Sequence, residues 1–180
     1  MLSKQTNIME TVILKPNNDT YNNLSDKWTL WAHLPHNVDW SLKSYIPIST
    51  FTTIEETVAV SETLPPLLIE NCMLFMMLYN IKPTWEDPKN RNGGCFSYKV
   101  SNKNVARSWI DLTYTIVGGS ISNSAAFVSS VTGITISPKK NFCIVKIWMG
   151  NCDHQNPSHI CPIQGMTNDG CLFKKHAPEY

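Results

Sequence analysis

The clearest helical pattern in the chain follows Asn104, where apolar residues recur every three or four positions. They are Val105, Trp109, Leu112 and Ile116, and a Gly-Gly pair then ends the pattern. A second helix is predicted over 54–64 because Thr53 and Glu56 form a capping box in front of it. Two consecutive prolines stop that helix.

Short apolar runs between polar segments predict strands. Such runs cover residues 28–34, 72–79, 95–100, 133–137 and 143–149. The last two flank a short turn, which is the pattern of a hairpin. No element is predicted between 35 and 52 or in the small, polar stretch 121–132. Strands interrupted by helices, with hairpins, predict an α+β domain with a mostly antiparallel sheet and helices on one face.

The length and composition favour one folded domain. The chain has 180 residues, 42% of them hydrophobic, which is enough for one core. Residues 1–26 have no sustained apolar period and are predicted to form a flexible arm, with the folded domain over 27–180. The apolar runs are too short to span a membrane and no secretory signal is seen, so a soluble, cytoplasmic protein is expected.

The charge and the cysteines exclude several kinds of site. A net charge of +1 gives no broad attraction for nucleic acid, so any RNA contact must be local and a pocket is favoured over a groove. Cysteines without a secretory signal are expected to be reduced. The tail gathers Cys152, His154, His159, Cys161, Cys171 and His176. Their spacing fits no zinc motif, so no metal or other cofactor is predicted, and a zinc-binding module is the weakest alternative.

The segment 81–94 carries the strongest functional signal. An exposed-looking loop seldom holds a tryptophan beside two carboxylates without a function. Its string Pro83-Thr-Trp85-Glu86-Asp87, followed by an Asn and a Gly-Gly pair, resembles the family of translation initiation factor 4E. The six tryptophans Trp28, Trp31, Trp40, Trp85, Trp109 and Trp148 all find positions in that family's pattern.

The resemblance covers residues 27–148, whereas the arm and the residues after 148 match poorly. It implies a curved antiparallel sheet backed by helices on its convex face. It also implies a pocket for the 7-methylguanosine cap of messenger RNA on the concave face. The chain after Trp148 is too short for the family's long third helix. In this tail, Lys174, Lys175 and His176 either approach the cap phosphates or are simply solvated.

The resemblance assigns the base of the cap to three tryptophans and a carboxylate. Trp40 and Trp85 would stack on the two faces of methylated guanine, whose positive charge adds cation–π attraction. Glu86 would accept hydrogen bonds from guanine N1–H and the exocyclic amine, while the Trp85 backbone N–H would donate to O6. Trp148 would lie near the methyl group.

The family grips the cap phosphates with an Arg and a Lys around the predicted hairpin, and this chain departs from that pattern. Lys139 falls at the Arg position, but Ile144 falls at the Lys position. Lys139, Lys140 and Lys146 are therefore the candidate phosphate ligands. Strand alternation predicts that Ile144, Lys146 and Trp148 share one face.

The family also docks a helical motif of a scaffold protein, initiation factor 4G, on its convex face. The resemblance places this surface at Leu24, Val58, Trp109, Ile110 and Asp111. Val58 stands where the family has a Trp, so the surface is predicted to be reduced. The chain is expected to be a monomer apart from capped mRNA and a scaffold of this type or a divergent equivalent, with no membrane partner.

Two cap-binding functions remain open from the sequence. The chain is either an initiation factor that recruits mRNA through a scaffold or a homologue that sequesters caps and represses translation or protects particular transcripts. A decapping or nucleotide-hydrolysing enzyme could also hold guanine. Neither a Glu-rich metal helix nor a nucleophile–base arrangement is seen, so an enzyme is not expected.

Overall fold

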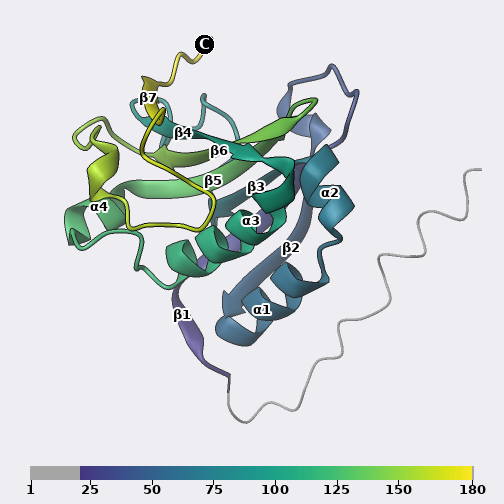
Figure 1. Cartoon of the computed structure of the whole chain (residues 1–180), viewed down its shortest axis with the longest axis horizontal. Helices are drawn as coiled ribbons and strands as arrows, with labels where there is room; N and C mark the ends of the chain where they lie inside the picture. The colour runs from purple at the N-terminus through teal and green to yellow at the C-terminus, as the bar shows by residue number, and fades with distance from the viewer. Residues whose placement is uncertain (1–20, 180) are drawn as a thin grey trace, which may run out of the picture.

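One sheet organises residues 21–179, the part of the chain that this computed structural model describes. Its strands are β1 (Asn23–His33), β2 (Tyr45–Thr53), β3 (Met73–Leu78), β4 (Gly94–Ser101), β5 (Val131–Pro138), β6 (Phe142–Met149) and β7 (Leu172–Lys175). They lie in the order β2-β1-β3-β5-β6-β4-β7, and every neighbouring pair is antiparallel. The sheet is open and curved (Figure 1), and the predicted α+β class is confirmed.

The long helices gather on one face of this sheet. The helices are α1 (Ile54–Thr63), α2 (Pro66–Asn71), α3 (Asn102–Val117) and α4 (Ala125–Ser130), with short 3-10 turns η2 (Leu42–Ser44) and η3 (Pro157–His159). In Figure 1, α1, α2 and α3 all lie in front of the sheet. We call this helix-covered side the convex face and the opposite side the concave face.

Strand alternation sorts the apolar side chains into two clusters on the two faces. The larger cluster lies between the sheet and the helices and includes Leu74 of β3, Ile134 of β5 and Trp109 of α3. The smaller cluster contains Phe75, the next residue of β3, and therefore lies on the concave face. Its buried members are Tyr45, Phe75, Met77, Ile81, Cys95 and Trp148. The concave face thus carries a partly aromatic layer of its own.

The two predicted helices are confirmed, and local sequence fixes their ends. Thr53 Oγ1 accepts a hydrogen bond from Glu56 N at 3.2 Å at the start of α1. The Glu56 carboxylate accepts from Thr52 N at 2.8 Å, one residue earlier than a capping box requires. At the end of α3, Gly118 is the C-cap and Gly119 follows with φ of 66°, a conformation that glycine adopts freely.

Four elements are not predicted by the sequence. Pro47 interrupts the apolar pattern of β2, and a proline is tolerated there because β2 is an edge strand. Helices α2 and α4 have six residues each, and β7 has four. Elements this short contain too few repeats to produce a recognisable period.

The start of β1 corrects the predicted boundary of the folded domain. β1 begins at Asn23, so residues 23–26 belong to the sheet and not to an arm. Asn22 Nδ2 donates to the Glu55 carboxylate at 2.8 Å, which ties this end of the strand to α1. Residues 1–20 lie outside the described residues. No helix in the described part of the chain is long and apolar enough to cross a membrane.

Candidate functional site

A continuous row of ring contacts crosses the concave face. It runs through Trp40, His33, Tyr45, Phe75, Trp148, His176 and Trp85, with centroid separations of 4.3, 5.2, 5.3, 6.4, 4.9 and 5.6 Å. We call these residues the aromatic row. The two tryptophans expected to stack on a base stand at its two ends, and the tryptophan expected to contact the methyl group belongs to it as well.

Trp40 lies in the loop between β1 and β2, stacked on His33 with an angle of 3° between the ring planes. His33 Nε2 donates to the backbone oxygen of Asp39 at 2.8 Å, so the ring that supports Trp40 is itself fixed. Asp39 accepts a hydrogen bond from Ser41 N at 2.7 Å, and this bond lowers the pKa of the Asp39 carboxyl. Trp40 remains 57% exposed, so the indole face away from His33 is open to a flat ligand.

Hydrogen bonds inside the loop 81–94 hold its tip in place. The buried Asp87 carboxylate accepts from the backbone N–H groups of Lys82 at 2.8 Å and Lys89 at 2.9 Å. The buried Asn90 side chain donates to the backbone oxygens of Lys82 at 3.0 Å and Thr84 at 2.9 Å. The Asp and the Asn of the sequence motif therefore shape the loop from within.

The Gly-Gly pair at the end of this loop lets neighbouring segments approach closely. A Cβ on Gly93 would lie 1.7 Å from the backbone oxygen of Met149, and one on Gly94 would lie 2.6 Å from the Phe173 ring. Gly93 O also accepts a hydrogen bond from His176 N at 3.0 Å. Any side chain at either glycine would displace the loop from β6 or from the C-terminal segment.

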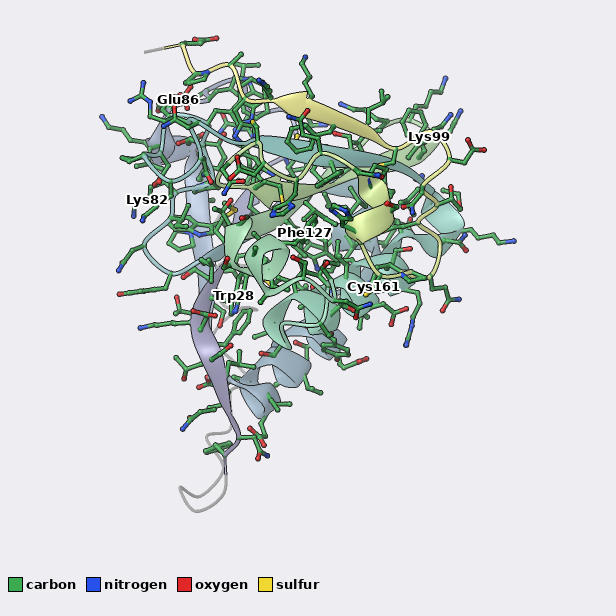
Figure 2. The ribbon with its side chains drawn as sticks, turned by 90° about the vertical axis from the view of Figure 1, so that its left-hand side faces the viewer. Trp28, Lys82, Glu86, Lys99, Phe127 and Cys161 are labelled. Carbon is green, nitrogen blue, oxygen red and sulfur yellow. The ribbon has the colours of Figure 1, made fainter. Side chains whose placement is uncertain are left out.

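Trp85 and Glu86 form the tip of this loop, and both are half-buried. Trp85 packs against the concave cluster. Glu86 Oε1 accepts one long hydrogen bond, from Glu179 N at 3.4 Å. Figure 2 shows Glu86 near the C-terminal end of the described chain. Among residues 21–179, no cation lies within salt-bridge distance of Glu86, so its carboxylate can accept hydrogen bonds from a ligand.

β6 presents Trp148 and Lys146 on the concave face. Val145 and Ile147, which alternate with them, belong to the cluster under the helices. The predicted alternation along this strand is therefore confirmed. Trp148 is 4% exposed, and its indole nitrogen has no hydrogen-bond partner. Lys146 is half-buried and stands two residues from Trp148 on the same face.

The structure places the other two candidate lysines far along the hairpin. Lys139 and Lys140 are exposed in the turn between β5 and β6, which Lys139 N closes by donating to Phe142 O at 2.8 Å. Phe142 and Trp148 are at opposite ends of β6, about 20 Å apart at the usual rise of a strand. These two lysines are therefore not brought together with Trp85, Glu86 and Trp148.

His176 is a member of the site for which the sequence gives only a weak signal. Its ring stacks on Trp85 with 14° between the planes, and its Nδ1 donates to the backbone oxygen of Asn90 at 2.7 Å. Its Nε2 is buried without a partner. Burial lowers the pKa of His176. The placement depends on β7, and this strand is too short to be recognised from its pattern.

The other histidines and cysteines of the tail do not join His176. His154 and His159 pack on Phe127 instead, with ring centroids 5.7 and 6.2 Å away. In the described residues, no group of three or more His, Cys, Asp or Glu side chains could hold a metal ion. All six cysteines are free thiols. A cavity of about 560 Å³ near Trp28 and Val128 contains none of the candidate cap ligands.

A family model described as eukaryotic initiation factor 4E matches residues 23–170. The chain belongs to the initiation factor 4E family. It is 29% identical over 141 residues to eukaryotic translation initiation factor 4E-2 of Schizosaccharomyces pombe, covering 74% of this chain and 56% of that protein. It is 30% identical to the Eremothecium gossypii factor, covering 69% of this chain and 61% of that one. The matched region thus spans less than two thirds of either relative.

Solved structures of the initiation factor 4E family share this fold. A schistosome eIF4E complexed with m7GpppG and 4E-BP is 26% identical, with a TM-score of 0.67 and coverage of 76% of each chain. The complex of C. elegans eIF4E-3 with the 4E-binding protein Mextli and a cap analog is 21% identical, with a TM-score of 0.66. It covers 74% of this chain and 76% of that one.

The residues that the initiation factor 4E resemblance assigned to scaffold binding differ in accessibility. Val58 on α1 is 41% exposed, and Leu24, Ile110 and Asp111 are half-buried. Trp109 is only 1% exposed, so its assignment to the surface is wrong. It lies on the inner stripe of α3 and supports the surface from beneath. Asp111 is engaged by Arg107 at 2.7 Å.

Proposed function

We propose that this chain binds the 7-methylguanosine cap of messenger RNA on the concave face of its sheet. The observation that carries the proposal is the loop 81–94, whose internal hydrogen bonds present Trp85 and Glu86 together. A stacking surface beside a carboxylate that has no cationic partner among residues 21–179 suits a positively charged guanine. Trp148 lies in the same apolar cluster as Trp85.

The chemistry of the site selects methylated guanine. Methylation at N7 gives the base a delocalised positive charge, so each indole face attracts it by about 0.5–2 kcal/mol beyond stacking. Trp85 offers one face. Trp40, whose side away from His33 is open, stands at the other end of the aromatic row and offers the second face once its loop moves toward Trp85. Glu86 accepts from guanine N1–H and the exocyclic amine, while the Trp85 backbone N–H donates to O6. Adenine presents the opposite donor and acceptor pattern at that edge.

Family membership supports a role in translation initiation. The curated relatives are named as initiation factors, and the schistosome neighbour was solved with m7GpppG and with 4E-BP. On this basis the chain acts in the cytoplasm and recruits capped mRNA to a 4G-type scaffold protein through Leu24, Val58, Ile110 and Asp111. The partly exposed Val58 supplies an apolar contact on that surface.

A second candidate function is sequestration of the cap without recruitment of the ordinary scaffold. Two observations favour it. Val58 stands at the position of a large aromatic anchor, and Asp111 already pairs with Arg107. Both features weaken a groove for a helical motif, since aromatic anchors supply much of the binding energy at interfaces. Cap binding on the concave face is the same in both functions.

Retention on immobilised 7-methylguanosine diphosphate tests the proposed function. The unmodified protein should be retained and should be eluted by the methylated nucleotide at concentrations where the unmethylated nucleotide fails. Glu86→Gln should weaken retention. Glu70→Gln, which removes the same charge in α2 on the convex side, should leave it unchanged. Equal elution by both nucleotides would contradict cap binding.

A further inference from the structure

Lys146 and Lys174 reach the same part of the concave face from two different strands. β4 lies between them, and its Cys95 pairs with Trp148 of β6 on one side and with Lys174 of β7 on the other. Residues directly opposite each other in an antiparallel pair have side chains on the same face. Lys174 therefore stands beside buried Cys95 on the concave face, close to Lys146.

The positive charges of Lys146 and Lys174 both act on the Cys95 thiol. Burial raises the pKa of the Cys95 thiol, and the positive charges of Lys146 and Lys174 act in the opposite direction. The strand register agrees with this common effect, because Lys174 lies directly opposite Cys95 and Lys146 lies two residues from Trp148, the other partner of Cys95. Neither is neutralised, because the salt bridge found among the described residues joins Arg107 and Asp111 instead.

The other lysines around this face are placed differently. Lys99 holds its ammonium 4.5 Å from the centre of an aromatic ring. Lys175 follows Lys174 in β7, so strand alternation turns it toward the convex side. Lys139 lies in the turn beyond the far end of β6, about 20 Å along the hairpin from Trp148. Of the lysines in β4, β6, β7 and the β5–β6 turn, Lys146 and Lys174 combine proximity to Trp148 with the correct face.

We propose that Lys146 and Lys174 form a two-lysine site that holds the triphosphate of the cap, an inference that rests on the proposed function. Strands lie about 4.8 Å apart, and residues on one face repeat about every 6.6 Å. The backbones of both lysines are therefore within about 10 Å of Trp148. A phosphate chain attached to a base at Trp85 and Trp148 comes within reach of both ammonium groups, which bind phosphate as point charges.

In this two-lysine site the phosphates lie near the outer strands β4 and β7, whereas the family resemblance places them near the β5–β6 turn. The turn has Lys139 and Lys140, but Ile144 occupies the next inward position on the concave face and offers no charge. Lys174 of β7 lies in register with Trp148 through Cys95, so it supplies a positive charge at the level of the bound base. The chain thus directs the bound RNA across the edge of the sheet formed by β7.

Single substitutions separate the candidate lysines. The affinities of 7-methyl-GTP and of the 7-methylguanosine nucleoside are measured by fluorescence titration for Lys146→Gln, Lys174→Gln, Lys175→Gln and Lys139→Gln. The first two should each lose about tenfold in affinity for the triphosphate, while changing the nucleoside affinity less than about twofold. Each should also reduce the slope of log affinity against log salt. The two controls remove the same charge and should change neither affinity.

Several results would overturn the two-lysine site. One is an equal loss of 7-methyl-GTP affinity in Lys174→Gln and Lys175→Gln. Another is a larger loss of that affinity in Lys139→Gln than in Lys146→Gln or Lys174→Gln. A third is an equal loss of affinity for the nucleoside and for the triphosphate in Lys146→Gln or Lys174→Gln. These outcomes are distinct from failure of the proposed function, which would appear as equal affinity of the unmodified protein for 7-methyl-GTP and GTP. Thermal unfolding of each variant checks that the fold is intact.

Discussion

The imidazole of His176 lies nearly parallel to the indole of Trp85, with 14° between the planes and 5.6 Å between the ring centroids. His176 Nδ1 also donates to the backbone oxygen of Asn90, the residue that closes the loop from within. The C-terminal segment is thereby fastened to the loop that carries Trp85 and Glu86. The shape of the candidate site depends on residues far apart in the sequence.

His176 should make stability depend on pH. In the unfolded chain this histidine titrates near its ordinary pKa of 6.5, and burial lowers the pKa in the folded protein. As the pH falls through 6.5, the unfolded state binds a proton that the folded state resists, so the free energy of unfolding decreases. Its contribution is fully present above pH 6.5 and is lost as the pH falls toward the folded pKa. Urea unfolding between pH 8 and pH 5 measures it.

His176→Asn provides the control for this effect. The Asn amide can still donate to Asn90 O but does not titrate, so the variant should lose stability less steeply than the unmodified protein as the pH falls. An identical pH dependence in both proteins would show that His176 is not the group responsible.

Asn90→Ala should destabilise the fold and the site together. The substitution leaves the backbone oxygens of Lys82 and Thr84 without their donor, which costs about 1–3 kcal/mol when such groups are buried. Cap affinity should fall as well, because the tip of the loop is no longer held. Asn92→Ala, an exposed neighbour, should change neither quantity. Chemical denaturation of both variants measures the change in stability, and nucleotide titration measures the change in cap affinity.

Trp40→Ala and Trp85→Ala should each reduce the affinity for 7-methyl-GTP by about 1–3 kcal/mol, because each removes one stacked face. Trp40 is largely exposed, so its loss should leave thermal stability almost unchanged. Calorimetric titration gives the affinities. Full affinity in both variants would mean that the base binds elsewhere.

The convex face should bind an ordinary scaffold peptide weakly. A helical peptide with the Tyr-x4-Leu-apolar motif meets Val58 where the family offers a Trp, and loss of such an anchor removes about 2 kcal/mol or more. Val58→Trp should strengthen binding. Calorimetry that finds tight binding by the unmodified protein would contradict this expectation and argue against a sequestering role.

Strong local patterns in the sequence predict much of the fold. Helix α3 has its periodic apolar stripe, and the β5–β6 hairpin has two apolar runs around a short turn. The motif that contains Trp85 and Glu86 can also be recognised in the sequence, because the loop needs its Asp and its glycines to keep its shape. Asp87 accepts two backbone hydrogen bonds, and Gly93 has no room for a Cβ.

Local sequence patterns do not predict contacts between segments that are far apart in the chain. The pairing of β7 with β4 places the ring of His176, and a four-residue strand is too short for its sequence to predict that pairing. The family resemblance places Trp109 on the scaffold surface, but its position on the inner stripe of α3 buries it. Lys174 and Lys175 are alike in sequence, and only the register of β7 distinguishes their faces.

Titration of the unmodified protein with 7-methyl-GTP and with GTP, followed by intrinsic tryptophan fluorescence, tests cap binding most directly. Two stacked faces together favour the charged base by about 1–4 kcal/mol, so the methylated nucleotide should bind at least about fivefold more tightly and quench the fluorescence. Equal affinities for the two nucleotides would contradict the proposed cap site.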